Sequence, residues 1–356
     1  MHIAEAAISE LRERILAASA SGSALRLRGA GTKDFYGEHL EGEILDLTAH
    51  RGIVSYEPSE LVLTARCGTP LSQIEAALAA EWHLLPFEPP RFGADPTIGG
   101  VIAAGLSGPG RMQLGAVRDF VLGARLLDAH GDHLRFGGEV MKNVAGFDVA
   151  RLLCGSLGIL GVITEVSLKV LPLPRAQATL RLELAAPDAL RAFNRWAGEP
   201  LPLSAAAWHE GAAWIRLSGA VPAVGAACTR IGGEVVDAGP AHSFWQGLRD
   251  ITLPYLAREP LWRIAVPTTA APLALAATPL IDWAGALRWY SGVTDGSDAR
   301  AQAVAASGTA MCFRGPAHAS TRFHPLSAVA LKLHRRLKDR FDPRRIFNRS
   351  RLVAGL

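Results

Sequence analysis

The opening of the chain shows a helix-like spacing of apolar residues followed by short strand-like runs. Apolar side chains recur every four residues from Ile3 to Ile15, which predicts a helix that ends near residues 21–22. Strands are then predicted at residues 25–28, 43–47 and 61–66. A second helix follows, for which Thr69 is the expected cap and Pro70 the first residue. This mixture predicts an α+β fold.

A hairpin and one very regular strand come next. Residues 121–127 and 134–136 are predicted strands, joined by a polar loop that contains Gly131. Asp148 is expected to cap a short helix that follows it. Apolar and polar residues alternate over residues 162–170, and the prolines beyond end this strand.

The middle region, up to residue 313, has a different pattern. Strands are predicted at residues 180–184, 205–208, 214–217, 263–266, 287–290 and 309–313. Helices are predicted at residues 189–196, 221–231, 244–256 and 298–306. This order predicts an antiparallel sheet covered by helices on one face. A final helix at residues 326–341 carries Val329, Leu333 and Leu337 at a spacing of four.

Composition limits the class of protein. The 356 residues are 49% hydrophobic and 20% charged, with a net charge of +4, so we expect a compact chain with a sizeable core. The positive charge is too small to indicate a nucleic-acid-binding surface. A basic cluster near the C-terminus is instead interpreted as a solvated helix face or a subunit contact, and comprises Arg335, Arg336, Lys338, Arg340, Arg344 and Arg345.

Cysteine spacing and hydrophobic runs exclude further classes. The four cysteines lie far apart without CxxC or Cys/His spacing, so no metal site is expected and the thiols are expected to be reduced. The N-terminus does not have the pattern of a secretory signal. Three prolines and Asp282 interrupt the most apolar stretch, residues 265–287, which argues against a membrane-spanning helix. We expect a cytoplasmic chain, and leave open its peripheral attachment to the inner membrane through a partner.

The first chemical signal is the loop at residues 29–33, which follows a predicted strand. Alone it is weak, because many turns use two glycines. A GxGxxG dinucleotide motif would need glycine in place of Asp34, and no P-loop motif occurs. What remains is a run of backbone N–H groups beside Arg28, Thr32 and Lys33, which suits a pyrophosphate.

Two further loops of small residues strengthen this signal. Residues 97–100 precede a short helical segment, so their amides and the Thr97 hydroxyl are expected to meet the same anion. Residues 155–161 carry glycine at every third position before the regular strand, which lets backbone lie against a ring or a sugar. Each loop alone is a plausible structural turn, but the three together predict a diphosphate-binding groove.

The order of these motifs resembles the PCMH-type, or vanillyl-alcohol-oxidase-type, family of FAD-binding proteins. The resemblance rests on four segments: residues 28–32, 96–100, 158–164 and 341–348. It implies an α+β fold in which a two-subdomain FAD-binding part carries a short cap of antiparallel sheet and helices. The implied domains are an FAD-binding domain at residues 1–172, a reduced cap at 173–313, and a segment at 314–356 that returns to the FAD domain.

The resemblance also assigns the cofactor and its binding residues. These residues are Arg28, Gly29, Ala30, Gly31, Thr32, Lys33, Pro96, Thr97, Ile98, Gly99, Gly100, Gly105, Gly158, Gly161, Val162, Ile163 and Asn348. Covalent members of the family place a histidine in the first loop, where this chain has Thr32 and Lys33. We therefore expect FAD to be bound non-covalently.

Within the family, the chain is most similar to the shorter FAD-binding subunits of bacterial glycolate oxidases. Residues 141–148, 108–123 and 347–349 carry this likeness. It implies a subunit that passes electrons from glycolate or D-lactate through flavin to an iron–sulfur partner. The implied partners are a larger FAD-containing catalytic subunit, an iron–sulfur subunit and a small 2-hydroxy acid.

The catalytic role is the least defined part of this prediction. The 2-hydroxy-acid dehydrogenases of the family use an HxH-type metal pair in the middle domain and a Glu-His pair about thirty residues before the Asp-Pro, and neither motif occurs at these places in this sequence. No metal is expected, and the candidates for orienting an acid substrate are Arg111, Arg314, Arg322 and His324. Two alternatives stay open: a non-catalytic electron-relay or structural flavin subunit, and a stand-alone FAD-dependent oxidase or dehydrogenase.

Overall fold

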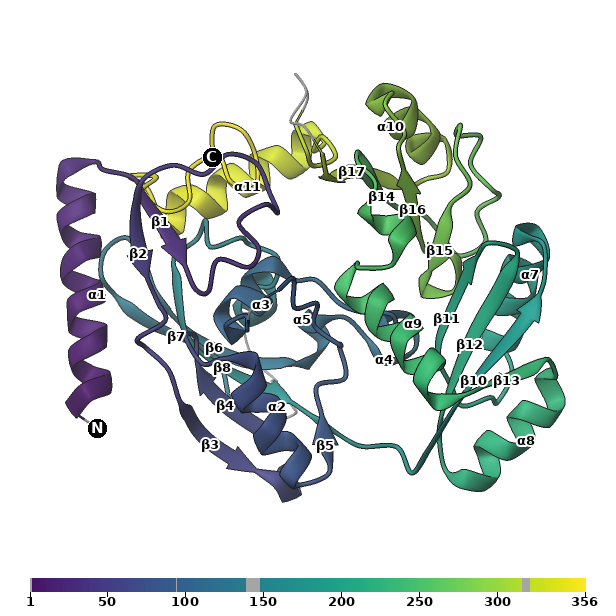
Figure 1. The fold of residues 1–356 in the computed structure, drawn as a ribbon. Helices are drawn as coiled ribbons and strands as arrows, with labels where there is room; N and C mark the ends of the chain where they lie inside the picture. Colours follow the sequence, from purple (N-terminus) through teal and green to yellow (C-terminus); the bar gives the residue numbers. More distant parts are fainter. Residues whose placement is uncertain (1, 94, 139–147, 316–320) are drawn as a thin grey trace. The chain divides into compact units, whose positions relative to one another are not determined.

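The structure is a computed structural model that describes residues 2–93, 95–138, 148–315 and 321–356 (Figure 1). Contacts between Cα atoms divide the chain into two compact units. The first unit comprises Met1–Leu106, Ala116–Pro172 and Pro325–Leu356, and the second comprises Ser107–Gly115 and Leu173–His324. The domain limits expected from the sequence stay a prediction.

A five-stranded antiparallel sheet forms the centre of the first unit. Its strand order is β3-β4-β8-β6-β7. The strands are β3 (Ile53–Glu57), β4 (Val62–Arg66), β6 (Val121–Leu127), β7 (His133–Gly137) and β8 (Val162–Lys169). The predicted hairpin is confirmed as β6 and β7, with Gly131 at φ 75° in the connecting turn. Strand β3 had no clear pattern in the sequence.

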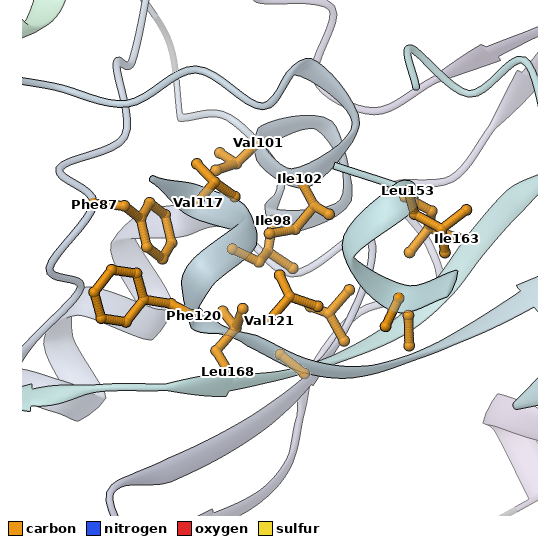
Figure 2. Packing of buried hydrophobic residues seen from close by; sticks show 14 of the residues in the cluster. Phe87, Ile98, Val101, Ile102, Val117, Phe120, Val121, Leu153, Ile163 and Leu168 are labelled. Carbon is orange, nitrogen blue, oxygen red and sulfur yellow. The ribbon is translucent and has the colours of Figure 1, made fainter. Parts of the chain in front are cut away.

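Short helices bury the apolar face of this sheet. They are α2 (Leu71–Ala80), α3 (Ile98–Ala104), α5 (Val117–Phe120) and α6 (Val149–Leu152). Figure 2 shows Ile98 and Ile102 of α3 packed among residues of the neighbouring segments, including Phe120, Val121 and Leu168. Asp148 caps α6 as predicted, since its Oδ1 accepts from the Arg151 N–H.

The predicted cap of α2 is wrong. The helix begins at Leu71, with Pro70 in the capping position and no side-chain hydrogen bond there. The Thr69 hydroxyl instead donates to the carbonyl of Arg66 and accepts from the N–H of Gly52. It therefore ties the turn after β4 to the start of β3.

A second layer of the first unit joins the two ends of the chain. The opening helix α1 (His2–Ser21) and the parallel pair β1 (Leu25–Arg28) and β2 (Glu43–Asp46) share one core with the C-terminal segment. Leu25 donates its N–H to Ile346, and Phe347 is fully buried in this core. The C-terminal helix α11 (Ala328–Phe341) leads into this segment (Figure 1).

An antiparallel sheet forms the second unit, as the sequence predicts, but it has eight strands where six were predicted, the additional ones being β13 and β15. Its order is β13-β10-β12-β11-β15-β16-β14-β17. The strands are β10 (Ala176–Glu183), β11 (Leu203–His209), β12 (Ala212–Gly219), β13 (Glu234–Val236), β14 (Leu261–Ala265), β15 (Leu280–Asp282), β16 (Leu287–Ser291) and β17 (Thr309–Arg314). A short pair, β5 (His83–Leu84) and β9 (Leu171–Pro172), belongs to the first unit.

Helices cover both faces of this sheet, which corrects the prediction of one covered face. They are α4 (Arg111–Leu114), α7 (Ala186–Ala197), α8 (Val221–Ile231), α9 (Ala238–Asp250) and α10 (Gly296–Ala305). Leu180 packs with α7 and α8, whereas its neighbour Thr179 accepts a hydrogen bond from Trp245 of α9 at 2.9 Å. Because successive side chains of a strand point to opposite faces, α9 lies on the other side.

The helix predicted at residues 244–256 is also placed differently. Helix α9 ends at Asp250 because Ile251 has a left-handed backbone, φ 55°. Pro254 then opens a separate 3₁₀ turn, Pro254–Ala257. Among the described residues, none of the helices combines the length and apolar character needed to cross a membrane.

Candidate functional site

An open pocket lies in the first unit where the three glycine loops converge. The lining residues are Leu27, Arg28, Gly29, Ala30, Gly31, Thr32, Lys33, Asp34, Leu40, Leu47, Cys67, Pro96, Thr97, Gly99, Gly100, Ala103, Ala104, Leu157, Gly158, Gly161, Ile163, Asn348 and Arg351.

The first loop presents free backbone donors to this pocket. It follows β1, and its residues 29–32 have no regular secondary structure. The N–H groups of Ala30, Gly31 and Thr32 make no hydrogen bond to any residue that the structure describes. A short run of unpaired N–H groups is a common binding site for anions.

Close packing explains the glycines of this loop. A Cβ on Gly29 would overlap the Oγ1 of Thr97, which belongs to the second loop. Gly31 has a φ of 73°, and a Cβ there would overlap the Arg28 guanidinium. The first two loops are therefore in direct contact, as a shared ligand between them would require.

Charged side chains make the first loop positive overall. Arg28, Lys33 and Arg351 line the pocket with a single carboxylate, Asp34. Asp34 accepts from Arg26 at 2.6 Å and from the Nε of Arg28 at 3.1 Å, which fixes both guanidinium groups. Charge-assisted hydrogen bonds of this kind orient arginine for binding a second anion.

Arg351 of the C-terminal segment is hydrogen-bonded to the end of the first loop and to the residues after it. It is only 5% exposed, and its guanidinium donates to the carbonyls of Glu38, Lys33 and Asp34 at 2.9, 3.1 and 2.8 Å. The C-terminal segment therefore sets the conformation of a loop more than 300 residues earlier in the chain.

The second loop is used differently from the expectation. The N–H groups of Ile98 and Gly99 are already bonded to the carbonyls of Thr69 and Cys67, both at 2.9 Å or less. The Thr97 hydroxyl accepts from Gly100 at 3.4 Å and so caps α3. Thr97 and Gly100 both line the pocket, and the hydrogen bond between them is long.

The third loop is fastened to α3 and to the C-terminal segment. The N–H of Leu157 donates to Ala103 at 2.9 Å. Asn348 accepts from the N–H of Leu27 at 2.8 Å and donates to the carbonyl of Leu157 at 2.6 Å. A single amide side chain thereby joins β1 to the third loop at the edge of the pocket.

A fully buried ion pair supports this junction. Lys338 donates to Asp342 at 2.7 Å and to the carbonyls of Ile159 and Phe347 at 2.7 and 2.8 Å. Asp342 in turn accepts from the N–H groups of Ile346 and Phe347 at 2.9 and 2.8 Å. Burial lowers the pKa of Lys338, and the charge of Asp342 opposes this effect.

The structure brings most of the predicted cofactor residues to one pocket, but three do not line it. Ile98 and Val162 are fully buried, each in a hydrophobic core. Gly105 ends α3 with a left-handed backbone and packs against Gly155. Pattern reasoning missed Arg351, Leu40 and Cys67, and of these only Arg351 is near a feature noted in the sequence, the basic C-terminus.

The four catalytic candidates do not line this pocket, and all four belong to the second unit. The Arg111 guanidinium lies 4.3 Å from the ring centre of Trp283. Arg314 donates to the carbonyl of Ile251 at 3.0 Å, and Arg322 to that of Gly315 at 3.1 Å. His324 accepts weakly from the N–H of Ala310, at 3.4 Å.

The pocket also contains one thiol, that of Cys67. Burial raises the pKa of the Cys67 thiol to about 12, so this pocket residue stays protonated at neutral pH. In the described part of the chain, no three His, Cys, Asp or Glu side chains gather as a metal site. The motif at residues 141–148 falls, apart from Asp148, outside the described residues.

Known proteins support the assignment of this pocket to a flavin-binding fold. The FAD binding domain family matches residues 4–137. Among solved structures, alkyldihydroxyacetonephosphate synthase has a TM-score of 0.64 at 13% identity, covering 96% of this chain and 75% of that chain. This likeness concerns the fold.

Two relatives are similar in sequence. The glycolate oxidase subunit GlcE of Escherichia coli (strain K12) is 45% identical over 347 residues, which is 97% of this chain and 97% of the relative. The glycolate oxidase subunit GlcD of Bacillus subtilis (strain 168) is 34% identical over 155 residues, 43% of this chain and 33% of that protein. The chain therefore belongs to the PCMH-type family of FAD-binding oxidoreductases, in the same group as the glycolate oxidase subunit GlcE.

Proposed function

We propose that the chain is the FAD-binding subunit of a glycolate oxidase complex, a 2-hydroxy-acid:acceptor oxidoreductase. The observation that carries this proposal is the similarity to GlcE along nearly the whole of both chains. The pocket supports the proposal independently, because the three glycine loops that the sequence predicts to bind a diphosphate all line one pocket.

The residues present fit FAD. The free N–H groups of Ala30, Gly31 and Thr32 and the cations of Arg28 and Lys33 would hold the pyrophosphate. On the other side of the pocket, small and apolar residues would contact the adenosine half; these are Gly158, Gly161 and Ile163. The described residues that line the pocket include no histidine, which supports non-covalent binding.

The chemistry that FAD supplies when bound is acceptance of a hydride from an alcohol carbon and release of its electrons one at a time. The protein's part is to orient the cofactor and exclude water from it. In this proposal glycolate or D-lactate becomes the 2-oxo acid, and the electrons leave through an iron–sulfur companion. The complex is cytoplasmic and reaches the inner membrane only through its companion subunits.

A relay role is the second candidate, favoured by one observation. The middle domain lacks the HxH-type pair, and no Glu-His pair stands about thirty residues before the Asp-Pro, where the 2-hydroxy-acid dehydrogenases of the family carry them. In that case a larger FAD-containing companion oxidises the acid, and this chain holds a second flavin for electron transfer or for stability. A stand-alone oxidase needs no companion at all.

Anaerobic addition of glycolate separates a stand-alone oxidase from a subunit of a complex. We expect the flavin of the assembled complex to bleach, as followed by visible absorption. Bleaching of the isolated chain as well, with turnover in the presence of oxygen, would establish a stand-alone oxidase. Bleaching only in the complex supports a subunit role, and a complex whose flavin never bleaches with glycolate or D-lactate would refute the proposal.

A further inference from the structure

The C-terminal helix α11 carries exposed apolar and basic side chains along one side. Val329 and Leu333 are 71% and 54% exposed, although their spacing of four is typical of a buried stripe. One and two turns further along the same side lie Arg336 and Arg340, with Lys332 beside them. We call these five residues the α11 outer face.

The charges of this face are not neutralised. Lys332, Arg336 and Arg340 are exposed, and none of them forms an ion pair with a described residue. The two carboxylates at this end of the helix are already engaged, Asp339 with Arg345 at 3.2 Å and Asp342 with the buried Lys338. The α11 outer face is therefore a small apolar patch continued by three cations for which the described residues supply no ion-pair partner.

We propose that the α11 outer face docks an acidic surface with a small apolar centre on a companion subunit of the same complex. The inference rests on the proposed function, which requires such companions. Charge complementarity selects the occupant, because these three cations favour an acidic partner and repel a second copy of this face. An anionic membrane surface fits less well, because the face has only two large apolar residues and no aromatic side chain to insert.

The helix that carries this face is also hydrogen-bonded to the cofactor site. The last turn of the same helix carries Lys338, which donates a hydrogen bond to the carbonyl of Ile159 in the third glycine loop. A companion seated on α11 would therefore lie against the element that supports the pocket.

The test uses the full chain, tagged and co-expressed with the larger FAD-containing subunit and the iron–sulfur subunit of its own complex. The variant Lys332→Glu/Arg336→Glu/Arg340→Glu reverses the charge of the face. We expect its affinity for the companions to fall by about tenfold or more. Val329→Ser/Leu333→Ser should weaken the same association without any change of charge.

The matched control is Arg118→Glu/Arg175→Glu/Arg258→Glu, which makes the same change of charge at three exposed arginines elsewhere. This control should retain the companions, and the wild-type association should weaken as salt concentration rises. Equal retention by the control and the charge-reversed variant would overturn the docking surface. So would binding to phosphatidylglycerol vesicles that is lost in the charge-reversed variant while the subunits stay assembled.

The ratio of FAD to protein, measured for every variant, separates the two proposals. A wild-type chain that cannot bind FAD refutes the proposed function itself. Chains that all contain FAD and all assemble equally well refute only the docking surface.

Discussion

Gly29 and Gly31 keep the pocket open at the scale of single residues. One glycine lets Thr97 approach the first loop, and the other leaves room for the Arg28 guanidinium that Asp34 holds in place. The donors that remain are backbone N–H groups, which cannot be removed by a side-chain substitution. A substitution of either glycine would, however, fill the space around these donors.

Gly29→Ala is expected to weaken FAD binding by about tenfold or more, equivalent to about 1.4 kcal/mol, because the new methyl group pushes Thr97 away from the loop. Fluorescence titration with FAD measures this. Gly225→Ala in α8 is the control, since a Cβ there meets nothing within 4 Å. Unchanged FAD affinity in Gly29→Ala would mean that the ligand does not depend on contact between the two loops.

His50 predicts how stability depends on pH. Burial is the main cause that lowers the pKa of His50 from 6.5 to about 4, and the charge of Arg66 is the second. The Nδ1 of His50 has no hydrogen-bond partner among the described residues. Below pH 6.5 the unfolded chain takes up a proton that the folded chain does not, so stability is lost as the pH falls from 6.5 to about 4. Above pH 6.5 this contribution is constant.

Urea unfolding across that pH range tests the assignment. His50→Gln should flatten the dependence of the unfolding midpoint on pH, whereas His39→Gln, at a side chain that is 70% exposed, should leave it as in the wild type. Burial also lowers the pKa of His133 and of His209, so part of the slope should remain in His50→Gln and become smaller when His133 is replaced as well. A wild-type profile in His50→Gln would contradict this account.

Loop chemistry could be predicted from the sequence because it is local. Within each loop the small residues and the polar groups beside them are adjacent in the chain, and residues of all three loops line the pocket. Arg351 and Cys67 could not be predicted, since their place in the pocket comes from contacts with segments far away in sequence. The amides of Ile98 and Gly99 were predicted to be free, but tertiary hydrogen bonds use them.

At the scale of elements, α11 and the segment after it hold the first unit together. The Lys338–Asp342 pair is 0% exposed on both sides, and each group has further backbone partners. A buried pair of this kind contributes little when compared with an apolar pair, but the loss of one partner leaves the other charge unpaired.

Lys338→Met is therefore expected to lower the free energy of unfolding of the first unit by about 3–5 kcal/mol. Arg335→Met, at an exposed position of the same helix, should change it by no more than about 0.5 kcal/mol. Denaturant unfolding followed by circular dichroism compares the two. Equal stability of the two variants would show that the pair is not required for the fold.

Element type was easier to predict than the face that each element covers. Alternation of apolar and polar residues located most strands of both sheets, but not β3, β13 or β15. The placement of α9 was wrong because Phe244 and Trp245 pack on Trp214 and Thr179, a contact that no periodicity indicates. The stripe of α11 shows the converse, since Val329 and Leu333 follow a helical period but stay exposed.

At the scale of the whole molecule, cofactor binding and stability should be linked. A ligand that binds only the folded chain stabilises it by about 2.7 kcal/mol at a free concentration of 100 times its Kd. We therefore expect added FAD to raise the melting temperature of the chain freed of flavin. Thermal unfolding with increasing FAD measures this, and AMP at equal concentration is the control for general nucleotide effects. An identical shift with both ligands would contradict specific recognition of the flavin dinucleotide.

The central claim is that this chain holds FAD non-covalently in the pocket of the three loops. The visible absorption spectrum of the purified chain, before and after denaturation and filtration, tests it most directly. The account predicts a yellow protein whose flavin passes the filter after denaturation, and a largely colourless Gly29→Ala variant. A colourless wild-type chain that does not take up added FAD, or flavin that stays with the denatured chain, would contradict it.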